Sequence, residues 1–265
     1  MIEIDKIYNE DCLLTMQRMP DGMVDLVVTS PPYDNLRTYN GYSFDFERVA
    51  KELYRVVKQG GVVVWIVNDA TIDGSETGTS FRQALFFKEC GFNLHDTMIW
   101  IKNGGGAVGS NFCYMQNFEY MFVFSKGRPN HVNLICDSPR HRQPIKKEFI
   151  AMGRRVPNGD IRTERRKPEK EYCRRNNWWY IVPQKEEGTE FHPAVFPEAL
   201  ARDHIYSWSE VGGVVYDPFM GSGTTAKMAV RLKRHYIGSE ISAEYAELAR
   251  KRVWNEERQL SLDFD

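Results

Sequence analysis

Short apolar segments alternate with longer amphipathic segments along most of the chain. Apolar or alternating runs bounded by turn-forming residues predict strands, and these cover residues 2–8, 24–28, 62–67, 94–101, 120–124, 214–216 and 236–238. Apolar residues at helical spacing predict helices over residues 13–19, 46–57, 81–90, 200–205, 226–232 and from 243 onward. Gly60 and Gly61 are expected to end the helix over residues 46–57. Strands that alternate with helices predict a doubly wound α/β fold.

Polar residues follow several of the predicted strands directly. Asp11, Ser30, Asp217 and Glu240 each stand where a strand is expected to end. Doubly wound folds bind ligands at the carboxyl ends of their strands. We therefore expect these residues to lie along one edge of the sheet, beside a ligand.

Composition adds limits on class and compartment. A chain of 265 residues suits one large α/β domain with an inserted lobe, and its net charge of -1 means that any charged binding surface is local. Scattered cysteines without CxxC spacing predict free thiols in a reducing compartment, with neither a metal site nor a disulfide framework; they are Cys12, Cys90, Cys113, Cys136 and Cys173. Without a signal-peptide pattern or a membrane-length apolar run, we expect a cytoplasmic protein.

The composition changes between about residues 126 and 187. Apolar periodicity fades there and basic residues crowd in, so we expect an inserted lobe that separates residues 1–125 from residues 188–265. The residues expected to contact DNA phosphates or bases are Arg140, Arg142, Lys146, Lys147, Arg154, Arg155, Arg165 and Arg166. The alternative is a solvated charged loop. Residues 178–180, Trp-Trp-Tyr, are expected to pack the lobe onto the sheet rather than to touch DNA.

The stretch Ser30-Pro31-Pro32-Tyr33 is the first chemical motif. Proline cannot donate to a ladder and fixes its own backbone, so the strand over residues 24–28 must end there in a rigid turn. The turn presents one hydroxyl, backbone carbonyls and one aromatic ring. Such a rim of acceptors beside a stacking surface suits a flat ring that bears an amine. The alternative is a strand-ending loop with a packed tyrosine.

The second motif spans residues 217–225, Asp-Pro-Phe-Met-Gly-Ser-Gly-Thr-Thr, between a strand and a helix. Gly221 and Gly223 allow the backbone a tight turn and a close approach to a ligand. The helix N-terminus after them suits an anion, but the lysine of a Walker A loop is missing. Glu240 stands where an acid binds ribose hydroxyls. S-adenosylmethionine, an adenosine with an amino-acid tail, fits both ends; the alternative is a tight turn that needs glycine for packing.

The two motifs together resemble those of amino-group DNA methyltransferases. Residues 30–33 are similar to the catalytic motif of this family, and residues 217–224 are similar to its cofactor motif. The catalytic motif comes first, then the basic lobe, His192-Pro193-Ala194 and the cofactor motif, an order that resembles the circularly permuted beta-type group. The resemblance implies a mostly parallel seven-stranded sheet with one antiparallel strand.

The resemblance also implies roles for individual residues. Ser30 Oγ and the Pro31 carbonyl would accept hydrogen bonds from the amine of a flipped-out base, and Tyr33 would stack on the base, so the expected catalytic set is Ser30, Pro31, Pro32 and Tyr33. The residues expected to bind S-adenosylmethionine are Asp11, Cys12, Thr29, Ser30, His192, Pro193, Asp217, Pro218, Phe219, Gly221, Ser222, Gly223, Thr224, Thr225 and Glu240. Asp11 could instead cap the helix that follows it, and His192 could be structural. Cytosine C5 chemistry is not expected, because the chain has no Pro-Cys pair.

Serine at the first position of the catalytic motif resembles the N4-cytosine group, whereas the N6-adenine group more often carries aspartate or asparagine there. The sequence therefore favours a site-specific N4-cytosine DNA methyltransferase of a restriction-modification system or a phage, with N6-adenine as the alternative. A DNA-binding module that has lost catalysis, and methylation of a protein or RNA amine, remain open. Double-stranded DNA is the expected partner; a homodimer and a cognate restriction endonuclease are further partners that the resemblance leaves open.

Overall fold

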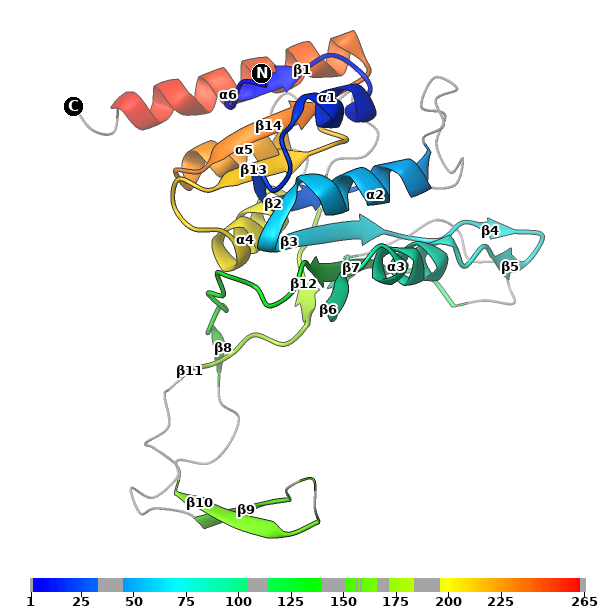
Figure 1. The fold of residues 1–265 in the computed structure, drawn as a ribbon, viewed down its shortest axis with the longest axis vertical. Helices are drawn as coiled ribbons and strands as arrows, with labels where there is room; N and C mark the ends of the chain where they lie inside the picture. The colour runs from blue at the N-terminus through cyan, green and yellow to red at the C-terminus, as the bar shows by residue number, and fades with distance from the viewer. Residues whose placement is uncertain are drawn as a thin grey trace. The chain divides into compact units, whose positions relative to one another are not determined.

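The computed structural model describes residues 2–32, 45–103, 114–139, 151–155, 157, 159–165, 172–183 and 196–262 (Figure 1). The chain divides into two compact units. The first comprises Met1–Asn133 and Asn177–Asp265, and the second comprises Leu134–Asn176. The second unit is shorter than the lobe expected over residues 126–187, because both flanks of that lobe belong to the first unit.

The first unit is built on a mixed sheet of eight strands in the part of the chain that the structure describes. Their order is β1 (Lys6–Tyr8), β14 (His235–Ser239), β13 (Val214–Asp217), β2 (Val24–Thr29), β3 (Val57–Val67), β7 (Phe118–Ser125), β6 (Asn93–Ile101) and β12 (Trp178–Tyr180). Strand β7 pairs antiparallel with both of its neighbours, and the other pairings are parallel. The expected doubly wound, mostly parallel fold is confirmed.

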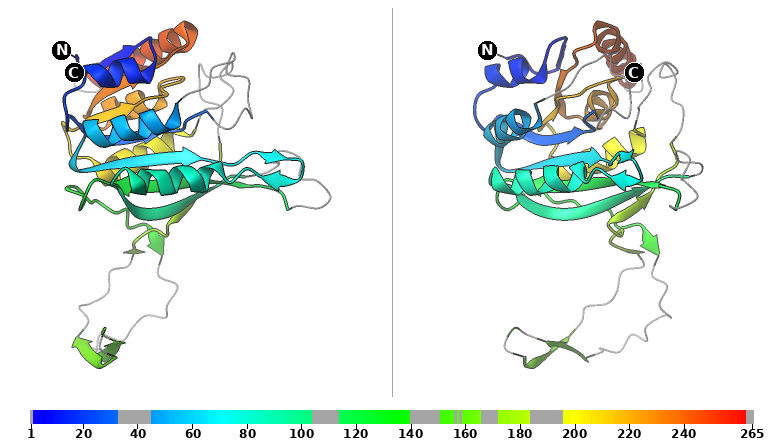
Figure 2. Two further views of the ribbon diagram at one scale, coloured as in Figure 1. Left: turned by 45° about the vertical axis from the view of Figure 1, so that its right-hand side comes forward. Right: turned by 90° about the vertical axis from the view of Figure 1, so that its right-hand side faces the viewer.

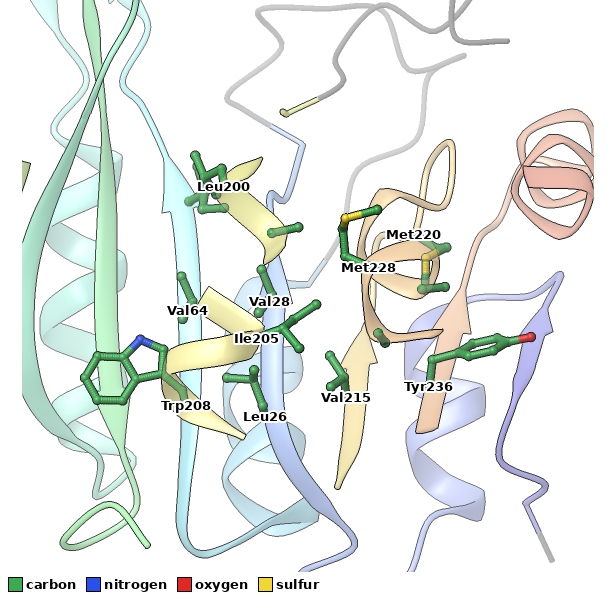
Figure 3. Close-up of a cluster of buried hydrophobic side chains, with 14 of the residues drawn as sticks. Leu26, Val28, Val64, Leu200, Ile205, Trp208, Val215, Met220, Met228 and Tyr236 are labelled. Atoms are coloured by element: carbon green, nitrogen blue, oxygen red, sulfur yellow. The ribbon is translucent and has the colours of Figure 1, made fainter. Parts of the chain in front are cut away.

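Helices cover both faces of this sheet (Figure 2). One face carries α1 (Cys12–Arg18), α2 (Phe46–Val56) and α3 (Thr79–Glu89), and the other carries α4 (Glu198–Trp208), α5 (Thr224–Arg231) and α6 (Ala243–Leu262). Successive side chains of β2 alternate between the two cores: Val27 packs with the first group of helices, and Leu26 and Val28 pack with the second (Figure 3). Burial on both faces explains the unbroken apolar runs of the central strands.

Strand β3 begins earlier than the sequence suggested. Helix α2 ends at Val56, and Gly60 and Gly61 lie inside β3 rather than closing the helix. The register with β2 shifts there, since Val24 pairs with Val57 and Leu26 already pairs with Val62. Gly60 takes a φ of +79° in this bulge, and its N–H donates to the Lys126 carbonyl. Glycine therefore serves a bulge that local periodicity could not distinguish from a helix end.

Residues 178–180 form the eighth strand, which lies outside the expected set of seven. Strand β12 pairs in parallel with β6, and the Trp179 ring is buried and stacked on the His204 ring of α4 at 4.5 Å between centroids. This short segment therefore belongs to the sheet edge.

Within its described residues, the second unit holds two short antiparallel pairs. Strand β8 (Ser138–Pro139) pairs with β11 (Tyr172–Cys173), and β9 (Ala151–Arg155) pairs with β10 (Ile161–Arg165). A further small pair, β4 (Thr71–Ile72) with β5 (Ser75–Glu76), belongs to the first unit. None of the helices in the described ranges has the length and apolar character needed to cross a membrane.

Candidate active site

The two motifs lie at the carboxyl ends of adjacent parallel strands. Strand β2 leads into Ser30, and β13 leads into the glycine loop of residues 218–223. The strands pair in register, with Val215 opposite Leu26 and Tyr216 opposite Val27. Segments separated by about 190 residues of sequence thus meet at one edge of the sheet, where doubly wound folds bind ligands.

A buried carboxylate joins the two strand ends directly. The Asp217 side chain is 1% exposed, and its Oδ1 accepts hydrogen bonds from Thr29 Oγ1 at 2.6 Å and from the Phe219 N–H at 3.0 Å. Its Oδ2 lies 2.8 Å from Thr225 Oγ1 in α5. Thr29 and Thr225 are buried as well. These side chains bind one another, so we propose that they position the site rather than contact the cofactor.

The Thr225 hydroxyl constrains the protonation of this cluster. Thr225 Oγ1 lies within hydrogen-bond distance of both Asp217 Oδ2 and the Val28 carbonyl, at 2.8 and 3.1 Å, yet a hydroxyl carries one hydrogen. When Asp217 is ionised, Thr225 Oγ1 donates to Asp217 Oδ2. Below a pH of about 6, where Asp217 is protonated, the Asp217 O–H can donate to Thr225 instead, which leaves the threonine hydrogen for the Val28 carbonyl. Burial raises the pKa of Asp217 from 3.8 to about 6, against the opposing effect of the hydrogen bonds that it accepts.

We expect Asp217→Asn to remove the part of the pH dependence of the free energy of unfolding that arises from the Asp217 carboxyl. A carboxyl whose pKa is raised on folding contributes stability fully below its ordinary pKa of 3.8, and that contribution is lost as the pH rises through about 6. Asparagine keeps the shape and the donor of the protonated acid at every pH. Urea unfolding from pH 4.5 to 7.5 should show that the stability of the variant rises relative to wild type as pH increases. A constant difference across this range would contradict the protonated arrangement.

The glycine loop approaches α6 closely. Gly221 and Gly223 have φ angles of +53° and +85°, a region that favours glycine. A Cβ built on Gly223 would lie 2.8 Å from Ala249 Cβ and 2.9 Å from Ala249 Cα. Glycine is therefore required at position 223 both by backbone conformation and by the contact with α6.

Glu240 follows β14 and faces the same loop. Its Oε2 accepts from the Gly221 N–H at 2.7 Å, and its Oε1 accepts from the Ser242 N–H at 2.9 Å. Burial raises the pKa of the Glu240 carboxyl. Strand β14 separates β13 from β1 in the sheet, so Glu240 extends the row of strand-end residues to the side of the loop away from Ser30.

Asp11 and Cys12 follow β1 on this edge. Asp11 is exposed, and its Oδ1 accepts from the Leu13 N–H at 2.7 Å, which is the helix-capping alternative of the sequence analysis. The capping bond is observed, whereas a role for Asp11 in cofactor binding remains a prediction. Burial, together with the Asp11 charge, raises the pKa of the Cys12 thiol to about 12, so this cysteine is not a thiolate nucleophile at neutral pH.

The other residues expected in the site differ in their burial, and some of them lie outside the described ranges. Pro31 is buried, and Ser30 and Pro32 are partly exposed; Pro218 and Ser222 are buried, and Phe219 packs edge-on to Trp65. Residues expected in the site that lie outside the described ranges are Tyr33, His192 and Pro193. Among the expected DNA-binding residues, Arg140, Arg142, Lys146, Lys147 and Arg166 also lie outside them.

One residue at this site carries no motif signal. Arg252 of α6 is 6% exposed and donates to the Ser222 carbonyl of the glycine loop. In the sequence it is one of several basic residues in an amphipathic helix, and nothing local separates it from its exposed neighbours. Only the three-dimensional packing of α6 on the loop reveals it.

Comparisons with known proteins identify relatives across nearly the whole chain. Residues 24–251 match the family N6_N4_Mtase, described as DNA methylase. The orphan methyltransferase M.BamHII of Bacillus amyloliquefaciens is 53% identical over 244 residues, which cover 90% of this chain and 92% of that protein. The cytosine-N4-specific PvuII DNA methyltransferase has a similar fold, with a TM-score of 0.70 and 20% identity over 93% of this chain and 85% of its own. The M1.HpyAVI–SAM complex gives a TM-score of 0.61 and 22% identity over 94% of this chain and 98% of its own.

Proposed function

The chain belongs to the N6/N4 family of DNA methylases, and from this premise we propose that it transfers a methyl group from S-adenosylmethionine to the N4 amine of cytosine in duplex DNA. The methyl donor and the DNA substrate are those of the family. The choice of cytosine N4 over adenine N6 is the finer part of the proposal.

The observation that carries the proposal is the junction of the two motifs. The residue before Ser30, Thr29, bonds at 2.6 Å to Asp217, the first residue of the cofactor motif. A base held at Ser30 would therefore stand next to a donor held by the glycine loop. Methyl transfer needs this proximity, because the amine must attack the methyl carbon in line.

The residues of the loop fit S-adenosylmethionine. Gly221 and Gly223 let the backbone approach a ligand, and the Glu240 carboxylate beside Gly221 is an acceptor suited to ribose hydroxyls. The bound cofactor supplies an electrophilic methyl group on a sulfonium. We propose that Glu240 and the glycine loop bind the adenosine part of the cofactor. Asp11 lies at the same edge of the sheet.

The chain's own contribution to the reaction is the orientation of the amine. An exocyclic amine is a poor nucleophile while its lone pair is delocalised into the ring. Ser30 Oγ and the Pro31 carbonyl would accept its two hydrogen bonds and favour a tetrahedral nitrogen with a free lone pair. The proline pair keeps these acceptors rigid, so their dipoles need no reorganisation during the reaction. Extrusion of the base costs a few kcal/mol, which stacking on Tyr33 would partly return.

Serine at position 30 supports cytosine as the target, as does the structural likeness to a cytosine-N4-specific enzyme at the level of the fold. A labelled-cofactor assay on mixed genomic DNA, followed by digestion and nucleoside analysis, tests the proposal. N4-methylcytosine is expected. A product that is mostly N6-methyladenine would overturn the base assignment, and DNA binding without any methylated nucleoside would overturn the enzymatic proposal.

The second unit is proposed to contact DNA through the β9–β10 hairpin. The register sets Arg154 opposite Arg162, with Arg155 and Arg165 also on these strands. Four arginines on two short strands supply the local positive charge that attracts a polyanion such as DNA. A two-stranded ribbon is also of a size that enters the major groove.

Arg154→Ala combined with Arg162→Ala should weaken DNA binding about tenfold at low salt and lower the slope of log affinity against log salt by about 0.9 per lost phosphate contact. Cofactor binding should stay at the wild-type level. Arg48→Ala on α2, whose side chain is exposed, is the matched control. Fluorescence anisotropy with labelled duplex at several salt concentrations measures both quantities, and an unchanged slope would exclude phosphate contacts by this arginine pair.

We propose a role in DNA modification within a restriction-modification system or a phage. M.BamHII is an orphan methyltransferase, so a companion endonuclease does not follow from membership of the family. The proposed methyl transfer does not depend on one.

A further inference from the structure

Arg252 holds the glycine loop from outside the two motifs. Its Nη1 donates to the Ser222 carbonyl at 2.9 Å, to Ser222 Oγ at 3.0 Å and to Thr224 Oγ1 at 3.3 Å. Ser222 and Thr224 flank Gly223, the residue of the loop with the larger positive φ angle. One guanidinium group thus contacts the Ser222 carbonyl and the side chains on both sides of Gly223.

The same guanidinium is anchored to a second helix. Arg252 Nη2 donates to Glu198 Oε1 at 3.0 Å, and Glu198 begins α4. Glu198 also pairs with Lys227 of α5 at 2.5 Å. Burying a guanidinium is costly unless its hydrogen bonds are satisfied, and here they are divided between the carboxylate and the loop. The bond to Glu198 fixes the position of the Arg252 guanidinium. It thereby also fixes the Ser222 and Thr224 oxygens that accept hydrogen bonds from this group.

The planar fork of arginine is needed for this arrangement. One nitrogen faces the loop while the other faces Glu198, which a lysine with a single ammonium group cannot reproduce at both places. The loop has glycines at positions 221 and 223, so its own backbone is permissive. An external clamp that defines its conformation before ligand binding reduces the ordering cost of binding.

We propose that Arg252 is a positioning residue that sets the affinity of the glycine loop for S-adenosylmethionine. The proposal rests on the proposed function, since it takes the loop as the cofactor site. It separates the roles of two halves of the site: Arg252 acts on cofactor binding, whereas Ser30 and Pro31 act on the base.

Arg252→Met and Arg252→Lys test the proposal, with Arg231→Met as the matched control. Arg231 bonds to Glu256 at 2.6 and 2.7 Å and lies 3.6 Å from Glu198, so the control perturbs the same carboxylate network through a different helix. Loss of hydrogen bonds made by a charged group predicts that Arg252→Met raises the Kd and KM for S-adenosylmethionine by about tenfold or more. Arg252→Lys should give a smaller rise. The KM for DNA should stay within about twofold of wild type, as should the cofactor Kd of Arg231→Met.

Isothermal titration calorimetry with S-adenosylmethionine gives the Kd without any need for activity. Thermal unfolding with and without the cofactor shows that each variant folds, and Arg252→Lys provides the measurement if Arg252→Met does not fold. Equal weakening by Arg231→Met and Arg252→Met would overturn the proposal in favour of general stabilisation by the network. A parallel rise in the KM for DNA would overturn it as well. Wild-type protein that binds the cofactor but methylates no DNA would refute the proposed function and leave this binding test intact.

Discussion

Ser30→Ala should lower kcat by about 10²–10³-fold, the usual effect of removing one preorganised hydrogen-bonding group from a transition state. Ser30 directly follows the buried end of β2, where Thr29 is locked to Asp217, so its position is held by the sheet. The alanine variant loses the hydroxyl acceptor and keeps the backbone carbonyl of Pro31. Binding of S-adenosylmethionine and of DNA should change little, because the lost contact matters most when the amine becomes tetrahedral.

Single-turnover methylation with saturating cofactor and DNA isolates the chemical step from binding. Ser75→Ala, on the exposed β4–β5 hairpin, is the matched control for loss of a serine hydroxyl. Methylation by Ser30→Ala at the wild-type rate would contradict the role assigned to Ser30. A rise in the KM for DNA with an unchanged kcat would place Ser30 in ground-state binding instead.

Gly223→Ala should weaken cofactor binding at least about 100-fold and destabilise the fold by more than the 1–2 kcal/mol that a left-handed backbone costs an L-residue. The added Cβ would meet Ala249 Cβ at 2.8 Å and Ala249 Cα at 2.9 Å. These are atoms of the α6 backbone and its nearest side-chain carbon, so the loop must move away from the helix. Such a shift would displace the Ser222 and Thr224 atoms that Arg252 holds.

Gly212→Ala separates backbone strain from the steric contact. Gly212 has a φ of +79°, close to the +85° of Gly223, but a Cβ there would meet nothing within 4 Å. We therefore expect a loss of about 1–2 kcal/mol in the free energy of unfolding with unchanged cofactor affinity. Urea denaturation and calorimetric titration of both variants supply the comparison. Equal cofactor affinity in the two variants would show that the packing of the loop on α6 is unimportant for binding.

The periodic segments of the chain were predictable because their signals are local. The apolar run that ends at Ser30 and the glycine motif after Asp217 each define a strand and its end without reference to the rest of the molecule. Parallel strands end at the same edge of a doubly wound sheet, so their meeting at one site also followed from sequence. The start of β3 was predicted less well, because glycines at a bulge resemble glycines at a helix end.

The roles of buried polar residues could not be read in the same way. Asp217, Thr29 and Thr225 are predicted to bind the cofactor, and this stays a prediction; the structure adds that both threonine hydroxyls bond to the buried Asp217 carboxyl. Sequence proximity to a motif does not show which way a side chain points. Glu198 and Arg252, at the start of α4 and within α6, had no motif to mark them.

The sequence by itself determined the α/β architecture, the order of the two motifs and the family to which the chain belongs, because each depends on residue types at short spacing. The tertiary structure alone decided which polar groups brace the site. A buried hydrogen bond joins residues that can be far apart in the chain, as Thr29 and Asp217 are, and its energy depends on the burial and geometry of both partners. Neither property exists until the sheet has formed.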